Sequence, residues 1–225
     1  MHMSYNVAVD GPAGAGKSTI ARAVAERENL IYVDTGAMYR AMALFLLRSG
    51  VDLEDETQIA AKCQKAKITI RYEEGVQVVV LNGENVNGFL RTEQVGDAAS
   101  RTSPVPEVRK NMMKLQKELA EENDCIMDGR DIGTRVLPDA QLKIYLTASV
   151  EIRARRRFEE LAAKGEICDL AQIQADIEER DYRDMHREIS PLVQAADAIL
   201  VDTSSMGVEE VVERICEQIR RQKGR

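Results

Sequence analysis

The sequence Val7-Ala-Val-Asp-Gly-Pro-Ala-Gly-Ala-Gly-Lys-Ser-Thr19 sets the architecture of this chain. It meets every specified position of the spacing G-x-x-x-x-G-K-[ST], which is typical of a phosphate-binding loop, or P-loop. An apolar run, residues 5–9, precedes the loop, and an apolar-periodic segment, residues 20–25, follows it. The motif needs a strand before it and a helix after it, so this context agrees with the motif. The specified positions are Gly11, Gly16, Lys17 and Ser18.

Each residue type in the loop has a physical reason. Glycines permit backbone conformations in which consecutive N–H groups turn inward around phosphate oxygens, and the helix that follows adds its positive N-terminal end. Lys17 is expected to reach the β- and γ-phosphates of a nucleoside triphosphate, and the Ser18 hydroxyl to ligate Mg²⁺. The glycines run G-x-x-G-x-G, which is not the dinucleotide-binding pattern. The predicted ATP-binding residues are Gly11, Ala13, Gly14, Ala15, Gly16, Lys17, Ser18 and Thr19.

Composition bounds the class of protein. The 225 residues suffice for one α/β domain and at most a small insert. Hydrophobic content of 44% and charged content of 31% are those of an ordinary globular protein, and no apolar stretch approaches the length of a membrane span. A net charge of −7 argues against a general nucleic-acid binder. We therefore expect a protein without nucleic-acid or membrane partners, and a monomer.

Cysteine and histidine usage excludes other chemistry. The four cysteines have no C-x-x-C spacing and there are only two histidines, so the usual zinc sites and a disulfide framework are not predicted. The N-terminus lacks a signal sequence, and we expect a cytoplasmic location. Whether Met1-His2-Met3 is native is left open. The cysteines are Cys63, Cys125, Cys168 and Cys216, and the histidines are His2 and His186.

Short apolar runs alternate with helical patterns along the chain. This rhythm is typical of a three-layer α/β/α fold, here with five parallel strands. An exception is the pair Ile68–Tyr72 and Val76–Leu81, which turn residues connect as an antiparallel hairpin. The expected parallel strands lie near residues 5–9, 30–33, 125–128, 142–146 and 198–202.

The hairpin divides the chain without making a second domain. We expect one P-loop domain over residues 1–225, with a core of about 4–62, 101–152 and 190–225. The hairpin belongs to an insert of about 63–100 that could close over a substrate. A helix that begins after Ser149 and breaks near Gly165 opens a short helical lid, about residues 153–189.

Polar residues follow the second and third expected strands, at the sheet edge where ligands bind in α/β proteins. Arg40 has a donor fork suited to a second phosphate group, although a solvated helix face explains it equally well. Asp128 resembles the carboxylate that supports Mg²⁺ through water in P-loop proteins, and a plain Asp-Gly turn is the alternative. Arg130 and Asp131 lie beside it.

Three further groups of charges lie on expected helices. Arg109 is in the first turn of a helix, where a cation is unfavourable, which is a weak hint of another role. Arginines crowded near residues 153–157 fit a lid that closes on triphosphate, or a solvated face. A third group of charged residues, spaced at i, i+4 and i+7, would lie along one face of a helix. Such a face suits either polar recognition or an ordinary set of salt bridges. This third group is Arg180, Asp184 and Arg187.

Together these segments resemble the cytidylate kinase family, in its longer bacterial-type form, over essentially the whole chain. The last two matches below are far more specific than a P-loop alone. Besides the P-loop and the hairpin, the matching segments are Asp34-Thr-Gly-Ala-Met-Tyr-Arg40, Asp128-Gly-Arg-Asp-Ile-Gly-Thr134, and Glu179-Arg-Asp-Tyr-Arg-Asp184 with Arg187 and Ser190-Pro-Leu192.

The resemblance implies transfer of the γ-phosphoryl group of ATP to CMP or dCMP. It implies a catalytic set of Lys17, Arg130, Asp131, Arg155 and Arg157. The residues implied in binding the acceptor phosphate are Arg40, Arg109 and Arg130. Those implied in recognising cytosine or ribose are Ser100, Asp131, Arg180 and Asp184, with Arg187 nearby and Thr35 where the family often has serine.

Two other classes stay open on the sequence. A P-loop kinase of UMP, AMP or a hydroxyl acceptor such as shikimate is the nearest, and a hydroxyl acceptor would use a carboxylate such as Asp34 or Asp131 as base. A nucleotide-switched binding protein is the other, but no N-K-x-D stretch for guanine is present. Transfer to a phosphate acceptor needs no base, because its oxygen is already ionised at neutral pH.

Overall fold

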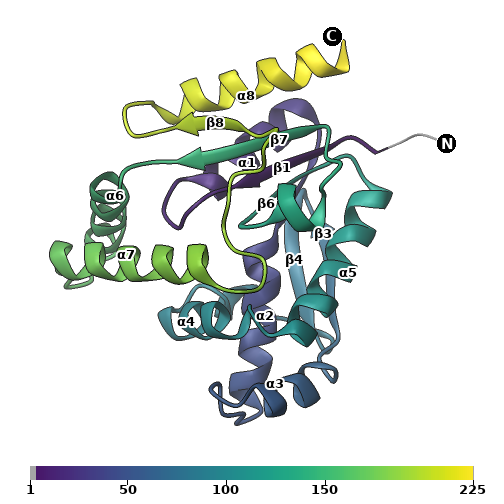
Figure 1. The fold of residues 1–225 in the computed structure, drawn as a ribbon, viewed down its shortest axis with the longest axis vertical. Coiled ribbons are helices and arrows are strands. Elements are labelled where there is room, and N and C mark those ends of the chain that lie inside the picture. The colour runs from purple at the N-terminus through teal and green to yellow at the C-terminus, as the bar shows by residue number, and fades with distance from the viewer. Residues whose placement is uncertain (1–3, 225) are drawn as a thin grey trace. The chain divides into compact units, whose positions relative to one another are not determined.

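The computed structural model describes residues 4–224, so Met1-His2-Met3 lies outside the described residues. Two compact units make up the described chain. The first consists of Ser4 and residues 31–123, and the second of residues 5–30 and 124–224. Figure 1 shows the elements of both.

Helices, a hairpin and one parallel strand build the first unit. The helix expected after Pro104 begins at Pro106, where proline is favoured in the first turn. Its elements are β2 (Ile31–Asp34), α2 (Thr35–Arg48), α3 (Glu56–Cys63), β3 (Ile68–Glu73), β4 (Val76–Leu81), β5 (Glu84–Asn85), the 3₁₀ turn Asn87–Phe89, α4 (Glu93–Thr102) and α5 (Pro106–Glu122).

The second unit alternates strands and helices. Within it α1 packs against α8, and α6 against α7. Its elements are β1 (Asn6–Asp10), α1 (Lys17–Glu28), β6 (Cys125–Gly129), the π-helical turn Ile132–Val136, β7 (Leu142–Thr147), α6 (Val150–Ala163), α7 (Leu170–His186), β8 (Ile199–Asp202) and α8 (Val208–Lys223).

The parallel sheet has five strands in the order β2-β6-β1-β7-β8, which confirms the predicted α/β class. In the second unit β1 is central: Val9 is in register with Asp128 of β6 and with Ile144 of β7. The inner strands are apolar on both faces because both are buried. The edge strand β8 instead alternates, with Val201 buried and Leu200 exposed. The carboxyl ends of β1 and β6 therefore meet at one edge.

The predicted hairpin is confirmed as an antiparallel sheet in the order β3-β4-β5. Both of its turns have two successive positive φ angles, at Glu74 and Gly75 and at Asn82 and Gly83. This geometry matches the right-handed twist of paired strands, which explains why an Asn-Gly pair marked one of the turns in the sequence.

Two features differ from the sequence predictions. Helix α4 was not predicted; Thr92 begins it by accepting a hydrogen bond from the Val95 N–H. The expected helical stripe through Arg187 is wrong, because α7 ends at His186 and Arg187 has an extended backbone, φ −64° and ψ 141°. Only Arg180 and Asp184 share a helical face. Among residues 4–224, no helix is long and apolar enough to cross a membrane.

Burial on the parallel sheet gives a stability prediction. Leu146 of β7 is fully buried, whereas Leu200 of the neighbouring strand β8 is 51% exposed. We expect Leu146→Ala to lower the free energy of unfolding by about 2–5 kcal/mol, because it leaves a cavity. The matched change Leu200→Ala is expected to cost less than about 1 kcal/mol. Urea unfolding followed by circular dichroism measures both, and equal losses would contradict the assignment of this core.

Candidate active site

The P-loop joins β1 to α1 through glycines whose conformations other residues rarely adopt. Gly11 has φ 148°, and a Cβ there would lie 1.9 Å from the Leu146 carbonyl oxygen of β7. Gly16 has φ 87° and begins α1 without a side-chain cap. The N–H groups of the first helical turn are therefore available to an anion. The loop is shaped for phosphate by its backbone.

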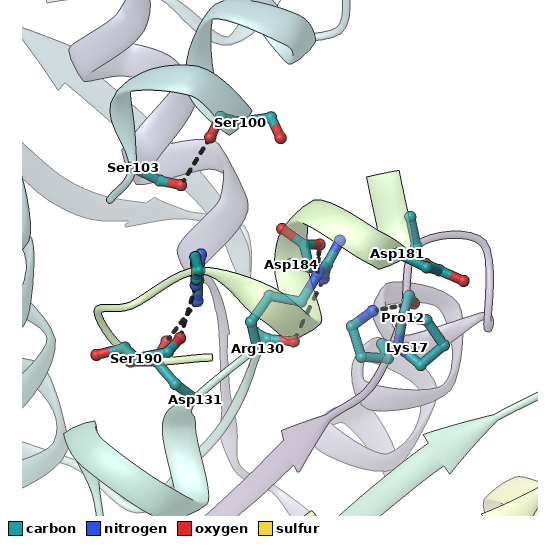
Figure 2. Close-up of polar contacts among 12 residues, drawn as sticks. Pro12, Lys17, Ser100, Ser103, Arg130, Asp131, Asp181, Asp184 and Ser190 are labelled. Atoms are coloured by element: carbon teal, nitrogen blue, oxygen red, sulfur yellow. Dashed lines mark hydrogen bonds and ion pairs between the residues drawn. The ribbon is translucent and has the colours of Figure 1, made fainter. Parts of the chain in front are cut away.

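Lys17 is buried at the start of α1. Its Nζ donates a hydrogen bond of 2.7 Å to the Pro12 carbonyl oxygen, as Figure 2 shows. Burial lowers the pKa of Lys17 well below its usual value, and the charges of Arg130 and Arg180 lower it further, whereas Asp128 and Asp184 oppose the shift. A bound phosphate would supply the negative charge that this group of cations needs.

Ser18 and Asp128 form an oxygen pair beside the P-loop. The Ser18 Oγ donates to Asp128 Oδ2 at 2.8 Å, and Asp128 lies in β6, which pairs with β1. Its carboxylate is buried. Hydroxyl and carboxylate oxygens are ligands that Mg²⁺ prefers, so both residues fit the role expected from the sequence.

The acceptor-side residues of the second unit form a connected cluster. Arg130 Nε lies 2.7 Å from Asp184 Oδ2 (Figure 2). Burial acts to raise the pKa of Asp184, but Arg130, Arg180 and Arg187 outweigh it and hold that pKa below its ordinary value. Because its charge acts on both Asp184 and Lys17, Arg180 belongs to this cluster. A carboxylate surrounded by arginines stays ionised and holds their donor groups in place.

Arg187 reaches the same cluster from outside the helix. Its Nη2 lies 3.9 Å from Asp131 Oδ1, and its Nε donates a 2.6 Å hydrogen bond to the Ser190 carbonyl oxygen. Ser190 itself has a positive φ of 53°, which turns the chain back at this point. The turn explains how a residue off the predicted stripe still contacts Asp131.

The crowded arginines of α6 fall into two kinds. Arg153 is buried and donates to the Ala13 carbonyl oxygen at 3.0 Å and to the Ala148 carbonyl oxygen at 2.9 Å, and it pairs with Asp181 at 2.6 Å. Arg156 donates to the Thr203 carbonyl oxygen at 2.8 Å. Arg153 and Arg156 therefore make contacts within the second unit.

Arg155 and Arg157 are the exposed arginines of this group. Arg157 pairs with Glu160 on the same helix at 2.8 Å, and both side chains are about half exposed, so this pair contributes little to stability. Of the four arginines, these two are the most exposed to solvent.

In the first unit, the candidates gather around α2. Asp34 caps this helix by accepting from the Ala37 N–H at 2.8 Å, and it pairs with Arg91 at 2.7 Å. The Arg40 guanidinium and the same carboxylate both lie next to Gly36, since a Cβ there would be 3.2 Å from Asp34 Oδ1 and 3.3 Å from Arg40 Nη1. Thr35 is buried in the first turn of α2.

Two more candidates flank α2. The Arg109 guanidinium of α5 lies 6.0 Å from the ring centroid of Tyr39. Ser100 belongs to α4, which packs on α2, and its carbonyl oxygen accepts from Ser103 Oγ at 3.2 Å (Figure 2). The predicted site residues of the first unit therefore lie on α2 or on the helices α4 and α5 that pack against it, whereas Arg155 and Arg157 of the second unit lie on the exposed side of α6.

Sequence reasoning missed two positioning side chains, Gln77 and Asp10. Gln77 of β4 accepts from the Asp34 N–H at 2.8 Å and donates to the Asp34 carbonyl oxygen at 3.2 Å. Asp10 accepts from two backbone N–H groups of the loop that follows Arg130. A charged residue at the end of an apolar strand was a signal for Asp10, whereas nothing near Gln77 distinguished it.

Comparisons with known proteins support the same assignment. The family model described as cytidylate kinase matches residues 7–221. The chain is 49% identical to a cytidylate kinase of Lactobacillus gasseri, covering 99% of this chain and 97% of that one. It is 46% identical to the cytidylate kinase of Geobacillus kaustophilus over the full length of both.

A solved structure agrees on the fold. An uncharacterised protein from Eubacterium ventriosum aligns with a TM-score of 0.53 at 13% identity, covering 99% of each chain. The P-loop that joins β1 to α1, the charged cluster at the ends of β1 and β6, and the match along nearly the whole sequence lead to one conclusion. This chain belongs to the cytidylate kinase family.

Proposed function

We propose that this protein transfers the γ-phosphoryl group of ATP to CMP or dCMP, forming ADP and the nucleoside diphosphate. One observation carries the proposal beyond family membership. Within the second unit, the charges of Arg130 and Arg180 lower the pKa of the P-loop lysine, Lys17. The three side chains therefore interact electrostatically. A donor triphosphate and an acceptor phosphate held there would meet, as in-line transfer requires.

The proposed mechanism relies on alignment and positive charge. The acceptor is a phosphate oxygen that is already ionised, so no residue has to remove a proton. Lys17 and Arg130 stabilise the charge that spreads over the transferring phosphoryl oxygens. Arg155 and Arg157, which are exposed on α6, add cations to the bound triphosphate and help to exclude water from it.

We propose that two sets of residues bind the acceptor. Arg40, Arg109 and Arg130 bind its phosphate, for which a guanidinium fork is suited. The residues proposed to recognise cytosine or ribose are Ser100, Asp131, Arg180, Asp184 and Arg187, with Thr35 beside them.

Mg²⁺ is the proposed metal, held by Ser18 together with phosphate oxygens and, through water, by Asp128. The 2.8 Å contact between the two side chains supports this role. When bound beside Ser18 and Asp128, the ion would supply positive charge that neutralises the charge developing on the phosphoryl group. Within residues 4–224, no group of three or more His, Cys, Asp and Glu side chains is arranged to hold a metal.

The remaining expectations are also proposals. The chain acts as a cytoplasmic monomer on free nucleotides, without nucleic-acid or membrane partners, as its net charge of −7 favours. Within one domain, the core of about 4–62, 101–152 and 190–225 carries the P-loop. The insert of about 63–100 and the lid of about 153–189 move during the reaction cycle.

A panel of acceptors tests the proposed function. With ATP and Mg²⁺ present, ADP formation is measured with CMP, dCMP, UMP, AMP and shikimate. We expect kcat/KM for CMP or dCMP to exceed that for AMP and shikimate by about 100-fold or more, because misplaced base contacts leave buried polar groups unpaired. Rates on CMP no better than on the others would refute the proposal.

Lys17 is the most direct test of the P-loop. We expect Lys17→Ala to lower kcat about 100-fold or more, because it removes a cation from the transferring phosphoryl group. Since Lys17 is buried with a lowered pKa, the loss of its charge should leave the fold intact. Circular dichroism checks the fold, and Lys164→Ala, on the exposed end of α6, is the control. Undiminished activity of Lys17→Ala would contradict its role.

Asp184 tests the acceptor site. We expect Asp184→Ala to raise KM for CMP about 10- to 100-fold, because it removes the charged partner of Arg130, with a much smaller effect on KM for ATP. Asp184→Asn keeps the shape and separates charge from packing. Asp176→Ala, on the exposed face of the same helix, is the matched control. Equal effects on both substrates would remove Asp184 from the acceptor site.

A further inference from the structure

Asp10 is the last residue of β1 and directly precedes Gly11 of the P-loop. Its side chain is buried, and both carboxylate oxygens are used. Oδ1 accepts from the Ile132 N–H and Oδ2 from the Gly133 N–H, each at 2.8 Å. One carboxylate therefore joins the residue that begins the P-loop to the chain that follows Arg130 and Asp131.

The two N–H groups belong to the first two residues of the π-helical turn Ile132–Val136. The Asp131 carbonyl oxygen begins the turn by accepting from Arg135 and Val136, and no side chain of the turn's own N-cap residue caps it. The first N–H groups of any helical turn have no partner inside it. Asp10 supplies that cap from a different strand, so the position of the turn depends on the end of β1.

The loop is also held from its other side. A Cβ on Gly133 would lie 3.1 Å from Lys143 Cδ and 3.4 Å from Asp10 Oδ2. The Lys143 side chain is itself fixed, because its Nζ lies 2.8 Å from Asp197 Oδ2. The backbone of Gly133 thus fits between the Asp10 carboxylate and the stem of Lys143, which leaves little freedom for the loop to shift.

We propose that Asp10 is a positioning residue for phosphoryl transfer: it holds the loop that carries Arg130 and Asp131 in a fixed register with the P-loop. The inference rests on the proposed function, in which Lys17 and Arg130 act on the same phosphoryl group. A displacement of about 1 Å in such an arrangement can cost about 100-fold in rate. Gly11 lies close to the backbone of β7. Asp10, the residue before it, connects this end of β1 to the loop that carries Arg130 and Asp131.

The ionisation of Asp10 provides an independent readout. Burial raises the pKa of Asp10 to about 6, the N–H groups of Gly133 and Ile132 oppose this shift, Asp131 adds to it and Lys17 opposes it. Lys143 is the other charged side chain packed against the loop. A protonated carboxyl has an O–H in place of one acceptor, so it can no longer accept from both N–H groups. The loop is therefore held best above about pH 6 and less well as the pH falls through that value.

The raised pKa of Asp10 also means that its ionised form lowers the stability of the fold. Because its pKa in the folded protein is above the ordinary value, ionised Asp10 is less favourable in the fold than in water. The folded state binds the additional proton between about pH 4 and 6, so the ionised form lowers stability above that range. The ionised carboxylate is retained in the interior although it costs folding free energy, which is typical of a residue kept for function.

Kinetics of Asp10→Asn test the proposal. The amide keeps the shape but offers only one acceptor oxygen. We expect KM for CMP to rise about 10-fold or more, and KM for ATP to change by less than about 3-fold, because the P-loop backbone stays in place. The matched control is Asp124→Asn, whose Oδ1 accepts from the Tyr5 N–H at 2.7 Å at the opposite end of β1. That variant should match the unmodified enzyme.

The pH profile gives the second readout. In the unmodified enzyme and in Asp124→Asn, KM for CMP should rise below about pH 6 by more than CMP's own phosphate ionisation explains. Asp10→Asn should lack that additional rise, because it has no proton to gain. Profiles and KM values equal to those of the control would overturn the proposal. An equal rise in KM for both substrates would assign Asp10 a general structural role instead.

Nuclear magnetic resonance of the unmodified protein tests the contact without any variant. The amide resonances of Ile132 and Gly133 should shift with pH with a midpoint of about 6, since both N–H groups donate to the titrating carboxylate. Amide resonances that do not titrate at any pH at which the protein is folded would overturn the proposal even if an amide variant failed to fold, because they would show that the carboxylate is not their acceptor. This measurement involves no substrate, so its outcome is independent of whether CMP is the acceptor.

Discussion

Burial of charge at the carboxyl ends of β1 and β6 is the constraint on which the second unit depends. Asp10, Asp128 and Asp131 are buried there, together with Lys17. Charges in a protein interior cost free energy unless each has partners, and replacing them by apolar groups is often stabilising. Here every one of the carboxylates accepts a hydrogen bond or faces a cation. The charged side chains at this edge are therefore held in place by one another and by neighbouring polar groups.

The same constraint explains what the sequence predicted well. Strands that end at the charged edge must be apolar along their length, because both of their faces are covered. The runs that end at Asp10 and Asp128 were therefore visible as short hydrophobic segments, each followed by an acid. The hairpin was visible for another reason, because its Asn82-Gly83 turn has a backbone geometry that few residue pairs adopt.

The sequence could not divide the arginines of α6 by role. Arg153 and Arg156 donate to backbone carbonyl oxygens of segments distant in the chain, and no local pattern reveals such a partner. Arg187 was misplaced for a related reason. Helical spacing was extended past His186, where the chain becomes extended, and the contact with Asp131 results from the turn at Ser190. In both cases tertiary contacts, not periodicity, decide the position of the charge.

The hairpin has a role inside the first unit that its sequence does not reveal. Gln77 pairs with both backbone groups of Asp34, and Asn87 in turn holds β4 by accepting from the Val79 N–H at 2.9 Å and donating to the Gln77 carbonyl oxygen at 2.9 Å. The antiparallel sheet therefore supports the beginning of α2, where Thr35 and Arg40 lie.

Arg153 restricts movement of α6 and α7 as one rigid body. A rotation of α6 about Ser149 would either break the hydrogen bond from the Arg153 guanidinium to the Ala13 carbonyl oxygen or move the P-loop together with the helix. The ion pair between Arg153 and Asp181 holds α7 at the same point. Bending that keeps both contacts intact would occur beyond Arg153, and the exposed side chains of Arg155 and Arg157 can change position by rotation without travel of the helix that carries them.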